Sequence, residues 1–153
     1  MSTPAAQLVD GPIDVAAVIA RVQRDARCGA VVLFLGCVRD QDPGEADDAR
    51  VARLDYDAYR PMASAALARI VDEIDDPDQP LRAAVVHRLG PVEAGEPSVA
   101  IAVASPRRDA AYAASRTLLE RLKREVPIWK REVRIDGAVR WREEEPLEGA
   151  ESG

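Results

Sequence analysis

The chain has 153 residues, 47% hydrophobic and 31% charged, with a formal net charge of −6 at pH 7. This length suits one domain with a substantial core, and the acidic balance argues against a general nucleic-acid binder, which is usually basic. No apolar run of about 18 residues could form a membrane span, and the first residues lack the pattern of a signal peptide. Two cysteines, Cys28 and Cys37, are too few for a disulfide framework, so we expect a cytoplasmic protein with reduced thiols.

The first part of the chain predicts one helix followed by two strands. Asp14 is a suitable N-cap for a helix whose apolar residues recur at helical spacing, and Gly29 follows it. The apolar run 30–38 predicts a strand buried on both faces. After a polar, acidic loop at 39–50, the alternation in 51–59 predicts a half-buried strand.

A second helix begins near Pro61, a residue that suits a first helical turn. Its predicted core positions repeat every four residues: Met62, Ala66, Ile70 and Ile74. The Asp/Pro-rich run 75–80 ends this helix. Two strands, 81–89 and 97–105, follow around a turn-rich connection.

A third helix is expected over 110–126, because the residue before Pro127 is pushed out of helical geometry. Further on, Asp136-Gly137 predicts a hairpin with a two-residue type I′ turn. Helices and strands mix without strict βαβ alternation, so the predicted class is α+β. We expect one domain over residues 1–142, followed by an acidic, disordered tail at 143–153.

The chain contains two lysines, Lys123 and Lys130, on either side of Pro127, whereas its other nineteen basic residues are arginines. Lys123 falls in the last turn of a helix, where the helix dipole favours a cation, and Lys130 follows on an extended segment. The bend at Pro127 can therefore turn both amines towards one pocket. A partly buried lysine can act as a base or nucleophile, which arginine cannot. We predict catalytic roles for both lysines, with chance clustering as the alternative.

Basic residues are concentrated in one segment. Residues 121–134 carry six basic and two acidic side chains, a local +4 that leaves −10 for the remainder. This pattern predicts one localised anion site, with a salt-bridged helix end as the alternative. Arg107 and Arg108 lie where a strand meets the start of the third helix, which suits a phosphate bound to the helix N-terminus. Two solvated loop arginines are the alternative at that point.

The end of the first predicted strand offers two further candidates. Arg39 can bind an anion through its guanidinium fork, while Cys37 is either a reactive thiol beside a cation or a small buried hydrophobe. His87 is the single histidine of the chain and is predicted to be structural. Without a second histidine or clustered cysteines, no metal site is predicted.

Five stretches, taken in order, resemble the catalytic (large) subunit family of molybdopterin synthase: GAVVLFLGCVRD, LDYDAYRPMA, VVHRLGPVEAGE, AVASPRRDAAY and LKREVPIWKRE. The resemblance runs from about residue 29 to residue 141. It implies an α/β-hammerhead fold with an additional antiparallel β subdomain. It also implies a homodimer that carries two small ubiquitin-like sulfur-carrier subunits, making a heterotetramer. The C-terminal Gly-Gly thiocarboxylate of the carrier would enter a pocket and transfer its sulfur to cyclic pyranopterin monophosphate, forming the molybdopterin dithiolene without a cofactor, nucleic acid or membrane.

By position, this resemblance makes Lys123 the main catalytic residue and Lys130 its companion. The implied substrate contacts, besides Lys123, fall on three segments: Cys37, Val38 and Arg39; Arg107 and Arg108; and Lys130, Arg131 and Glu132. In a symmetric dimer, Arg107 and Arg108 would serve the opposite protomer's site. Phe34 and Trp129 would offer flat apolar surface near the pterin.

Two positions depart from the family pattern. Arg107 stands where family members often have histidine, so only an anion-binding role carries over. Cys37 replaces a residue that is often larger or basic, so its backbone rather than its side chain is expected to line the site. Two other functions stay open at this point: a Schiff-base lysine enzyme acting on a phosphorylated carbonyl compound, and a scaffold that binds a ubiquitin-like partner without chemistry.

Overall fold

The computed structural model describes residues 5–41, 44 and 50–142, so the tail 143–153 and most of the loop 39–50 lie outside the described residues. Along them the elements follow in this order: β1 (Ala6–Asp10), α1 (Val15–Val22), β2 (Ala30–Cys37), β3 (Val51–Ala58), α2 (Arg60–Ile74), β4 (Arg82–Glu93), β5 (Pro97–Ser105), α3 (Arg108–Glu125), β6 (Ile128–Arg134) and β7 (Val139–Arg142). The mixed order confirms the α+β class. Among the described residues, none of the helices has the length and hydropathy that a membrane span requires.

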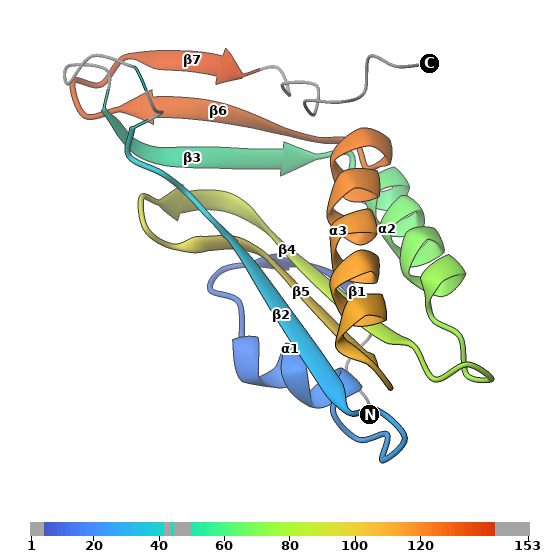
Figure 1. Ribbon diagram of the computed structural model, residues 1–153. Helices are drawn as coiled ribbons and strands as arrows, with labels where there is room; N and C mark the ends of the chain where they lie inside the picture. The colour runs from blue at the N-terminus through green and yellow to red at the C-terminus, as the bar shows by residue number, and fades with distance from the viewer. Residues whose placement is uncertain (1–4, 42–43, 45–49, 143–153) are drawn as a thin grey trace.

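The strands form a seven-stranded sheet in the order β2-β5-β4-β3-β6-β7, with β1 parallel to β4. The long strand β4 joins two parts of this sheet, because Arg82–His87 pair with β5 while Gly90–Glu93 pair with β3. We call β1, β2, β4 and β5 the main sheet, and β3, β6 and β7 the ribbon. Figure 1 shows the ribbon standing beyond one end of the main sheet. This arrangement is the predicted hammerhead fold with its additional antiparallel subdomain.

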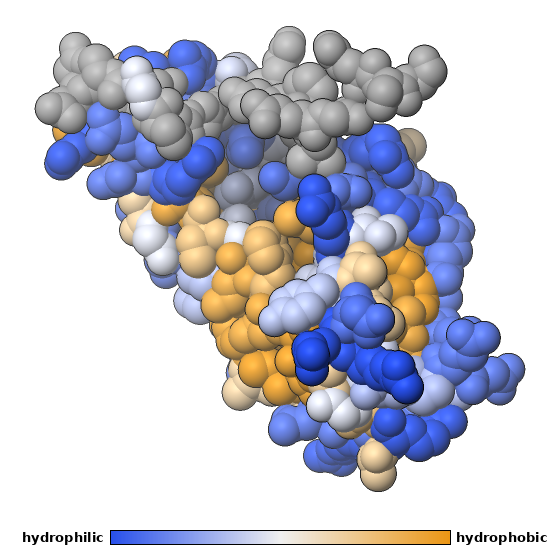
Figure 2. Space-filling model, viewed as in Figure 1, coloured by the Kyte–Doolittle hydropathy of each residue, from blue (hydrophilic) through white to orange (hydrophobic). Residues whose placement is uncertain are grey.

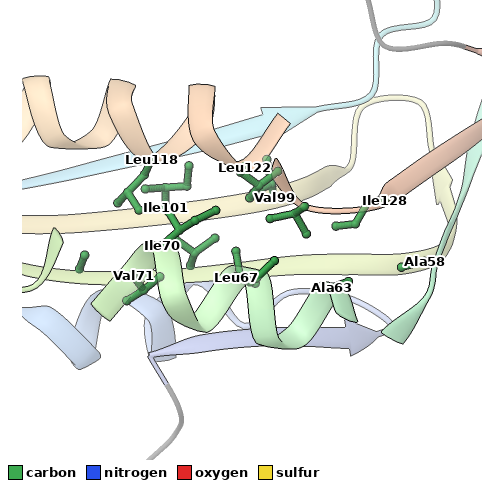
Figure 3. Packing of buried hydrophobic residues seen from close by; sticks show 14 of the residues in the cluster. Ala58, Ala63, Leu67, Ile70, Val71, Val99, Ile101, Leu118, Leu122 and Ile128 are labelled. Atoms are coloured by element: carbon green, nitrogen blue, oxygen red, sulfur yellow. The ribbon is translucent and has the colours of Figure 1, made fainter. Parts of the chain in front are cut away.

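Helices cover both faces of the main sheet, with α2 and α3 on one side and α1 on the other (Figure 1). In the larger core, apolar side chains from α2, α3 and the sheet pack together: Leu67, Ile70, Ile101, Leu118 and Leu122 (Figure 3). Side chains alternate along a strand, so the even-numbered alanines of β5 face α1 instead. Their small size lets α1 pack closely, and β5 is buried on both faces.

The predicted burial of 30–38 on both faces is wrong, because one face of β2 is largely uncovered within the chain; β2 is also an edge strand that pairs with β5 alone among the described strands. Its side chains at Val32 and Phe34 pack towards the larger core, but Val31 and Leu35 are 41% and 36% exposed. Figure 2 shows apolar residues gathered over this strand and the adjoining part of the surface. A continuous apolar run therefore does not require that both faces of a strand are covered within the chain.

The second helix forms as predicted, but Met62 is 57% exposed. A strict four-residue repeat drifts around a helix that has 3.6 residues per turn, so its first member moves off the buried face. The buried stripe follows mixed three- and four-residue spacing: Ala63, Ala66, Leu67, Ile70 and Val71.

The predicted hairpin forms between β6 and β7, but the two-residue turn is wrong. Val133 pairs with Val139, so the loop has three residues, 135–137, between Arg134 and Ala138. A type I′ turn needs positive φ at both central residues. Gly137 has a φ of +88°, whereas no non-glycine residue in the described part of the chain has a positive φ. The longer loop shifts the register by one residue and exchanges the faces of the paired side chains.

A register shift in the main sheet leads to a first testable prediction. Between Gly36 and Cys37 the pairing of β2 with β5 becomes irregular, and a Cβ at position 36 would lie 2.6 Å from Cγ1 of Val99. Because Val99 is buried and stiff, Gly36→Ala should lower the free energy of unfolding by about 1–3 kcal/mol, measured by urea denaturation. The double variant Gly36→Ala/Val99→Ala should lose less than the two single losses combined. Additive losses would show that the two residues do not clash.

Candidate active site

A pocket of about 360 Å³ lies where the ribbon meets the main sheet and the end of α3. Its wall combines the end of β2, the ribbon strands β3 and β6, the inner strands β4 and β5, and the last turns of α3. Polar side chains from all these elements border it: Cys37, Arg39, Tyr56, His87, Ser98, Lys123 and Lys130. The volume is in the range of pockets that hold small ligands.

The break between α3 and β6 brings the two lysines to this pocket. The helix ends at Glu125, and Val126 adopts extended geometry (φ −93°, ψ 121°) before Pro127. Lys123 therefore lies in the last helical turn and Lys130 in the following strand, and both border the pocket as the bend predicts. Lys130 is half-buried, but Lys123 is exposed, so within the single chain the expected partial burial holds for Lys130 only.

The basic segment 121–134 separates into paired arginines and pocket lysines. Arg121 contacts Glu73 and Glu125, each at 2.6 Å, and these ion pairs raise the pKa of Arg121 and lower that of Glu125. Arg131 is bound to Asp55 at 2.9 Å. The salt-bridged alternative thus describes these arginines, whereas Lys123 has no ion pair among the described residues and borders the pocket.

Arg131 and Glu132, both predicted substrate contacts, lie outside the pocket lining and hold the ribbon together. The guanidinium of Arg131 stands 5.9 Å from the centre of the Trp141 ring. Glu132 is only 1% exposed and lies 3.4 Å from Arg134 and 3.5 Å from Arg140. Within one chain, these side chains connect β6 to the neighbouring strands.

Arg107 and Arg108 are not brought to the pocket of their own chain. They lie at the start of α3. Arg108 precedes Lys123 by fifteen residues, and this separation corresponds to roughly 22 Å along the helix axis. Figure 1 shows that first turn at the far end of the main sheet from the ribbon. Both side chains are exposed, and Arg107 borders a separate groove near the end of α2.

The loop between β4 and β5 holds the segment Cys37–Arg39 in place. Val38 is 3% exposed, its N–H donates to the carbonyl of Glu96 (3.0 Å), and its carbonyl accepts from the N–H of Gly95 (2.7 Å). These two hydrogen bonds extend the sheet by one residue past β2. The side chains that flank Val38 consequently emerge at the pocket wall, where Arg39 and Cys37 both lie.

Arg88 and Glu96 fix the shape of that loop. The Arg88 guanidinium donates to the carbonyl of Pro91 (2.9 Å) and pairs with the Glu96 carboxylate (3.4 Å). The other oxygen of that carboxylate accepts from the N–H of Glu93 (3.1 Å). This geometry gives the HRLG…GE spacing of the sequence a physical role, because its arginine and glutamate close the loop that positions Val38.

Three residues that the sequence did not assign to the site form its floor. The Tyr56 hydroxyl donates to Ser98 Oγ (3.3 Å), which donates to the carbonyl of Gly36 (3.2 Å). The rings of His87 and Tyr56 pack in a T-shaped arrangement, with ring centres 5.1 Å apart and planes at 70°. Burial lowers the pKa of His87 to about 4, and the charge of Lys130 acts in the same direction. In the sequence, the single histidine within an apolar strand was the signal that could have pointed to His87 as a site residue.

Cys37 is exposed at the pocket, so the buried-hydrophobe prediction for it is wrong. It lies just after the register irregularity, where its side chain leaves the packed part of the sheet. Within the described residues, no group of His, Cys, Asp or Glu side chains is arranged to hold a metal ion.

Fold and pocket together define a hammerhead-type α+β protein whose pocket carries Arg39, Lys123 and Lys130. The chain belongs to the MoaE protein family, whose sequence model matches residues 8–125. It is 41% identical over 131 residues to the molybdopterin synthase catalytic subunit of Bacillus subtilis, covering 86% of this chain and 80% of that relative. It is 39% identical over 135 residues to molybdopterin synthase catalytic subunit 1 of Mycobacterium tuberculosis, covering 88% of each.

Solved structures agree with this assignment. The crystal structure of molybdopterin synthase from Staphylococcus aureus matches with a TM-score of 0.82 and 36% identity, covering 93% of this chain and 99% of that one. A complex of subunits 1 and 2 of molybdopterin-converting factor from Helicobacter pylori matches with a TM-score of 0.72 over 92% of each chain. At 21% identity, that second likeness concerns the fold alone.

The loop that positions Val38 can be tested by changing Glu96. Glu96→Ala leaves the largely buried Arg88 without its ionic partner and should lower the free energy of unfolding by about 1–3 kcal/mol. Hydrogen exchange at the Val38 amide should accelerate at the same time. Glu96→Gln keeps an acceptor for the N–H of Glu93, so it should change the free energy of unfolding and the exchange rate at Val38 less than Glu96→Ala does. Unaltered exchange at Val38 in Glu96→Ala would mean that the side-chain contacts do not control this segment.

Proposed function

We propose that the protein is the catalytic subunit of a molybdopterin synthase, a sulfurtransferase of molybdenum cofactor biosynthesis. In this reaction sulfur passes from the C-terminal thiocarboxylate of a small ubiquitin-like carrier to cyclic pyranopterin monophosphate, in two rounds that form the dithiolene. The observation that carries the chemistry is the meeting of Lys123 and Lys130 in one pocket beside Arg39. The relatives named above favour sulfur transfer over a Schiff-base enzyme or an inactive scaffold.

The charges of the pocket suit two anionic reactants. A Gly-Gly tail has no side chains, so its thiocarboxylate can enter a narrow space and meet Lys130, which is half-buried on β6. Lys123 stands at the exposed side, where it can exchange protons with the reacting groups and becomes covered once the carrier tail is bound. Fixed cations in a site from which water is displaced stabilise developing negative charge far better than in bulk water. Arg39 adds a fork for the substrate phosphate.

A symmetric dimer would supply the arginines that one chain lacks at its pocket. Arg107 and Arg108 lie too far from Lys123 to act in the same chain, as the length of α3 requires. The exposed apolar side of β2, with Val31 and Leu35, offers a surface that a second copy can cover. In this arrangement Arg107 and Arg108 of each subunit bind anionic substrate groups at the other subunit's pocket.

Each protomer would carry one carrier subunit, giving a heterotetramer in the cytoplasm. The ribbon offers a docking surface, because β7 pairs only with β6 among the described strands and exposes Val139 and Trp141. A carrier seated there lies next to the pocket that its tail enters, since β6 contributes Trp129 and Lys130 to the wall. The free thiols of Cys28 and Cys37 suit a reducing compartment.

Lys123→Arg tests the catalytic assignment. Arginine keeps the positive charge but stays protonated and is wider and planar. We therefore expect sulfur transfer to fall by about 10²–10⁴, with the fold and carrier binding preserved. Lys130→Arg should weaken substrate binding before it lowers the rate constant. Single-turnover rates with thiocarboxylated carrier provide the measurement, with thermal melts as a folding check.

Arg124→Lys is the matched control for this comparison. Its side chain lies one residue from Lys123, is 70% exposed and does not border the pocket. The Arg124→Lys variant should transfer sulfur at the parental rate. If Lys123→Arg also transfers sulfur at that level, the two lysines act only as charges and the catalytic assignment is wrong.

Mixed dimers test whether Arg107 acts across the subunit interface. Arg107→Ala and Lys123→Ala chains should each be nearly inactive alone. After co-expression with random pairing, half of the dimers contain one chain of each kind, and one of their two pockets has both intact residues. About a quarter of the sites should then recover. No recovery in mixed dimers verified by differential tags would place Arg107 in the pocket of its own chain, whereas full activity of Arg107→Ala alone would place it outside the reaction.

A further inference from the structure

His87 borders the pocket but has no part in the roles assigned above. It is only 5% exposed, and two contacts hold its ring. Nδ1 lies 2.8 Å from the carbonyl oxygen of Arg88, and the ring packs in a T-shaped arrangement with Tyr56, whose hydroxyl is bound to Ser98. A ring held in this way has a defined orientation before any ligand binds.

The contact with Arg88 determines which ring nitrogen carries the proton. A carbonyl oxygen can only accept a hydrogen bond, so Nδ1 donates and Nε2 of the neutral ring has a free lone pair. Nε2 has no hydrogen-bond partner among the described residues. Nε2 is not one of the fully buried side-chain atoms that lack a partner among the described residues, so it keeps some exposure, and His87 borders the pocket, where water or a ligand can bind this nitrogen.

The surroundings keep this histidine neutral. Charged and titratable groups border the pocket from the elements packed around it: Cys37 on β2, Arg39 after β2, Tyr56 on β3, Lys123 on α3 and Lys130 on β6. Burial is the main cause that opposes a second proton on the ring, and the ammonium of Lys130 adds to it, while the hydrogen bond to the Arg88 carbonyl acts in the opposite direction. The pKa of His87 is accordingly lowered to about 4, so Nε2 is an acceptor at any pH above about 5.

We propose that Nε2 of His87 is a ligand-binding acceptor at the floor of the pocket, which takes a hydrogen bond from an N–H group of the bound molecule. The nature of that molecule rests on the proposed function. Both the amide of a carrier's terminal glycine and the ring nitrogens of a pterin place an N–H near an anionic group. The cations bind the anion, while His87 selects molecules with a donor beside it. A buried site built in this way rejects analogues that lack the donor.

The first test needs neither a ligand nor turnover. Because the chain has one histidine, ¹⁵N NMR of histidine-labelled protein reports on His87 without assignment ambiguity. At pH 7 we expect a protonated Nδ1 and an unprotonated Nε2, with protonation of Nε2 only near pH 4. A proton on Nε2 at pH 7, or titration near pH 6.5, would overturn the proposal whether or not the protein transfers sulfur.

The second test identifies the donor. The probes are a synthetic peptide ending in Gly-Gly, the same peptide with N-methylglycine in last place, and neopterin monophosphate. His87→Phe keeps the ring packing but removes the acceptor, and it should weaken binding of either the Gly-Gly peptide or the pterin about tenfold. His87→Gln, whose amide oxygen can accept, should restore part of that loss.

The pattern across probes separates the two sources. If the donor is the glycine amide, N-methylation weakens the peptide in the parent protein but has no further effect in His87→Phe. If the donor is the pterin, only pterin binding depends on residue 87. If all three probes bind a folded His87→Phe as tightly as the parent, His87 is not a ligand-binding residue. If His87→Phe does not fold, the Nε2 signal of the parent protein provides the test, and we expect it to shift when one of the probes is added. A signal that does not shift with any probe would show that His87 is not a ligand-binding residue.

Discussion

The active-site geometry depends on one constraint, the inability of the chain to continue a helix through Pro127. Val126 leaves helical geometry, and β6 starts only two residues later, at Ile128. The helix before the break is held to the main sheet by Leu118 and Leu122, while the strand after it pairs with β3 along the ribbon. Because both sides are fixed, the bend angle is fixed as well. Lys123 and Lys130 can therefore approach one pocket from different elements.

The same junction explains how a mostly acidic protein presents a cationic pocket. The arginines around it are tied into the framework, as with Arg121 between two glutamates and Arg131 on Asp55. The two lysines differ from these arginines because both border the pocket, as Arg39 does. Lysine carries a compact charge that can exchange a proton, and arginine does not. The division of labour between the two residue types follows from this difference.

Features that local chemistry determines can be predicted from the sequence. The end of α3 at Pro127, the apolar stripes of the helices and the convergence of the lysines all depend on residues close together in the chain. Features decided by distant segments were missed. Strand β1 is defined by its parallel pairing with β4, and its five residues show no clear alternation. The edge position of β2 depends on which strands lie beside it, which its own apolar run does not reveal.

The hairpin and the pocket floor show the same limit. Asp136-Gly137 correctly predicted a turn, but the pairing of Val133 with Val139 selected a loop one residue longer. His87 could be recognised as buried, yet its place beside Tyr56 and Lys130 depends on strands β3 and β6.

In the proposed reaction, this pocket transfers sulfur from a carrier thiocarboxylate. The most direct measurement mixes the protein with thiocarboxylated carrier and cyclic pyranopterin monophosphate and follows both by mass spectrometry. We expect a pterin product that has gained two sulfur atoms as a dithiolene, with the carrier returned as its carboxylate. If both molecules bind but the carrier keeps its sulfur and the pterin is unchanged, the pocket does not catalyse sulfur transfer.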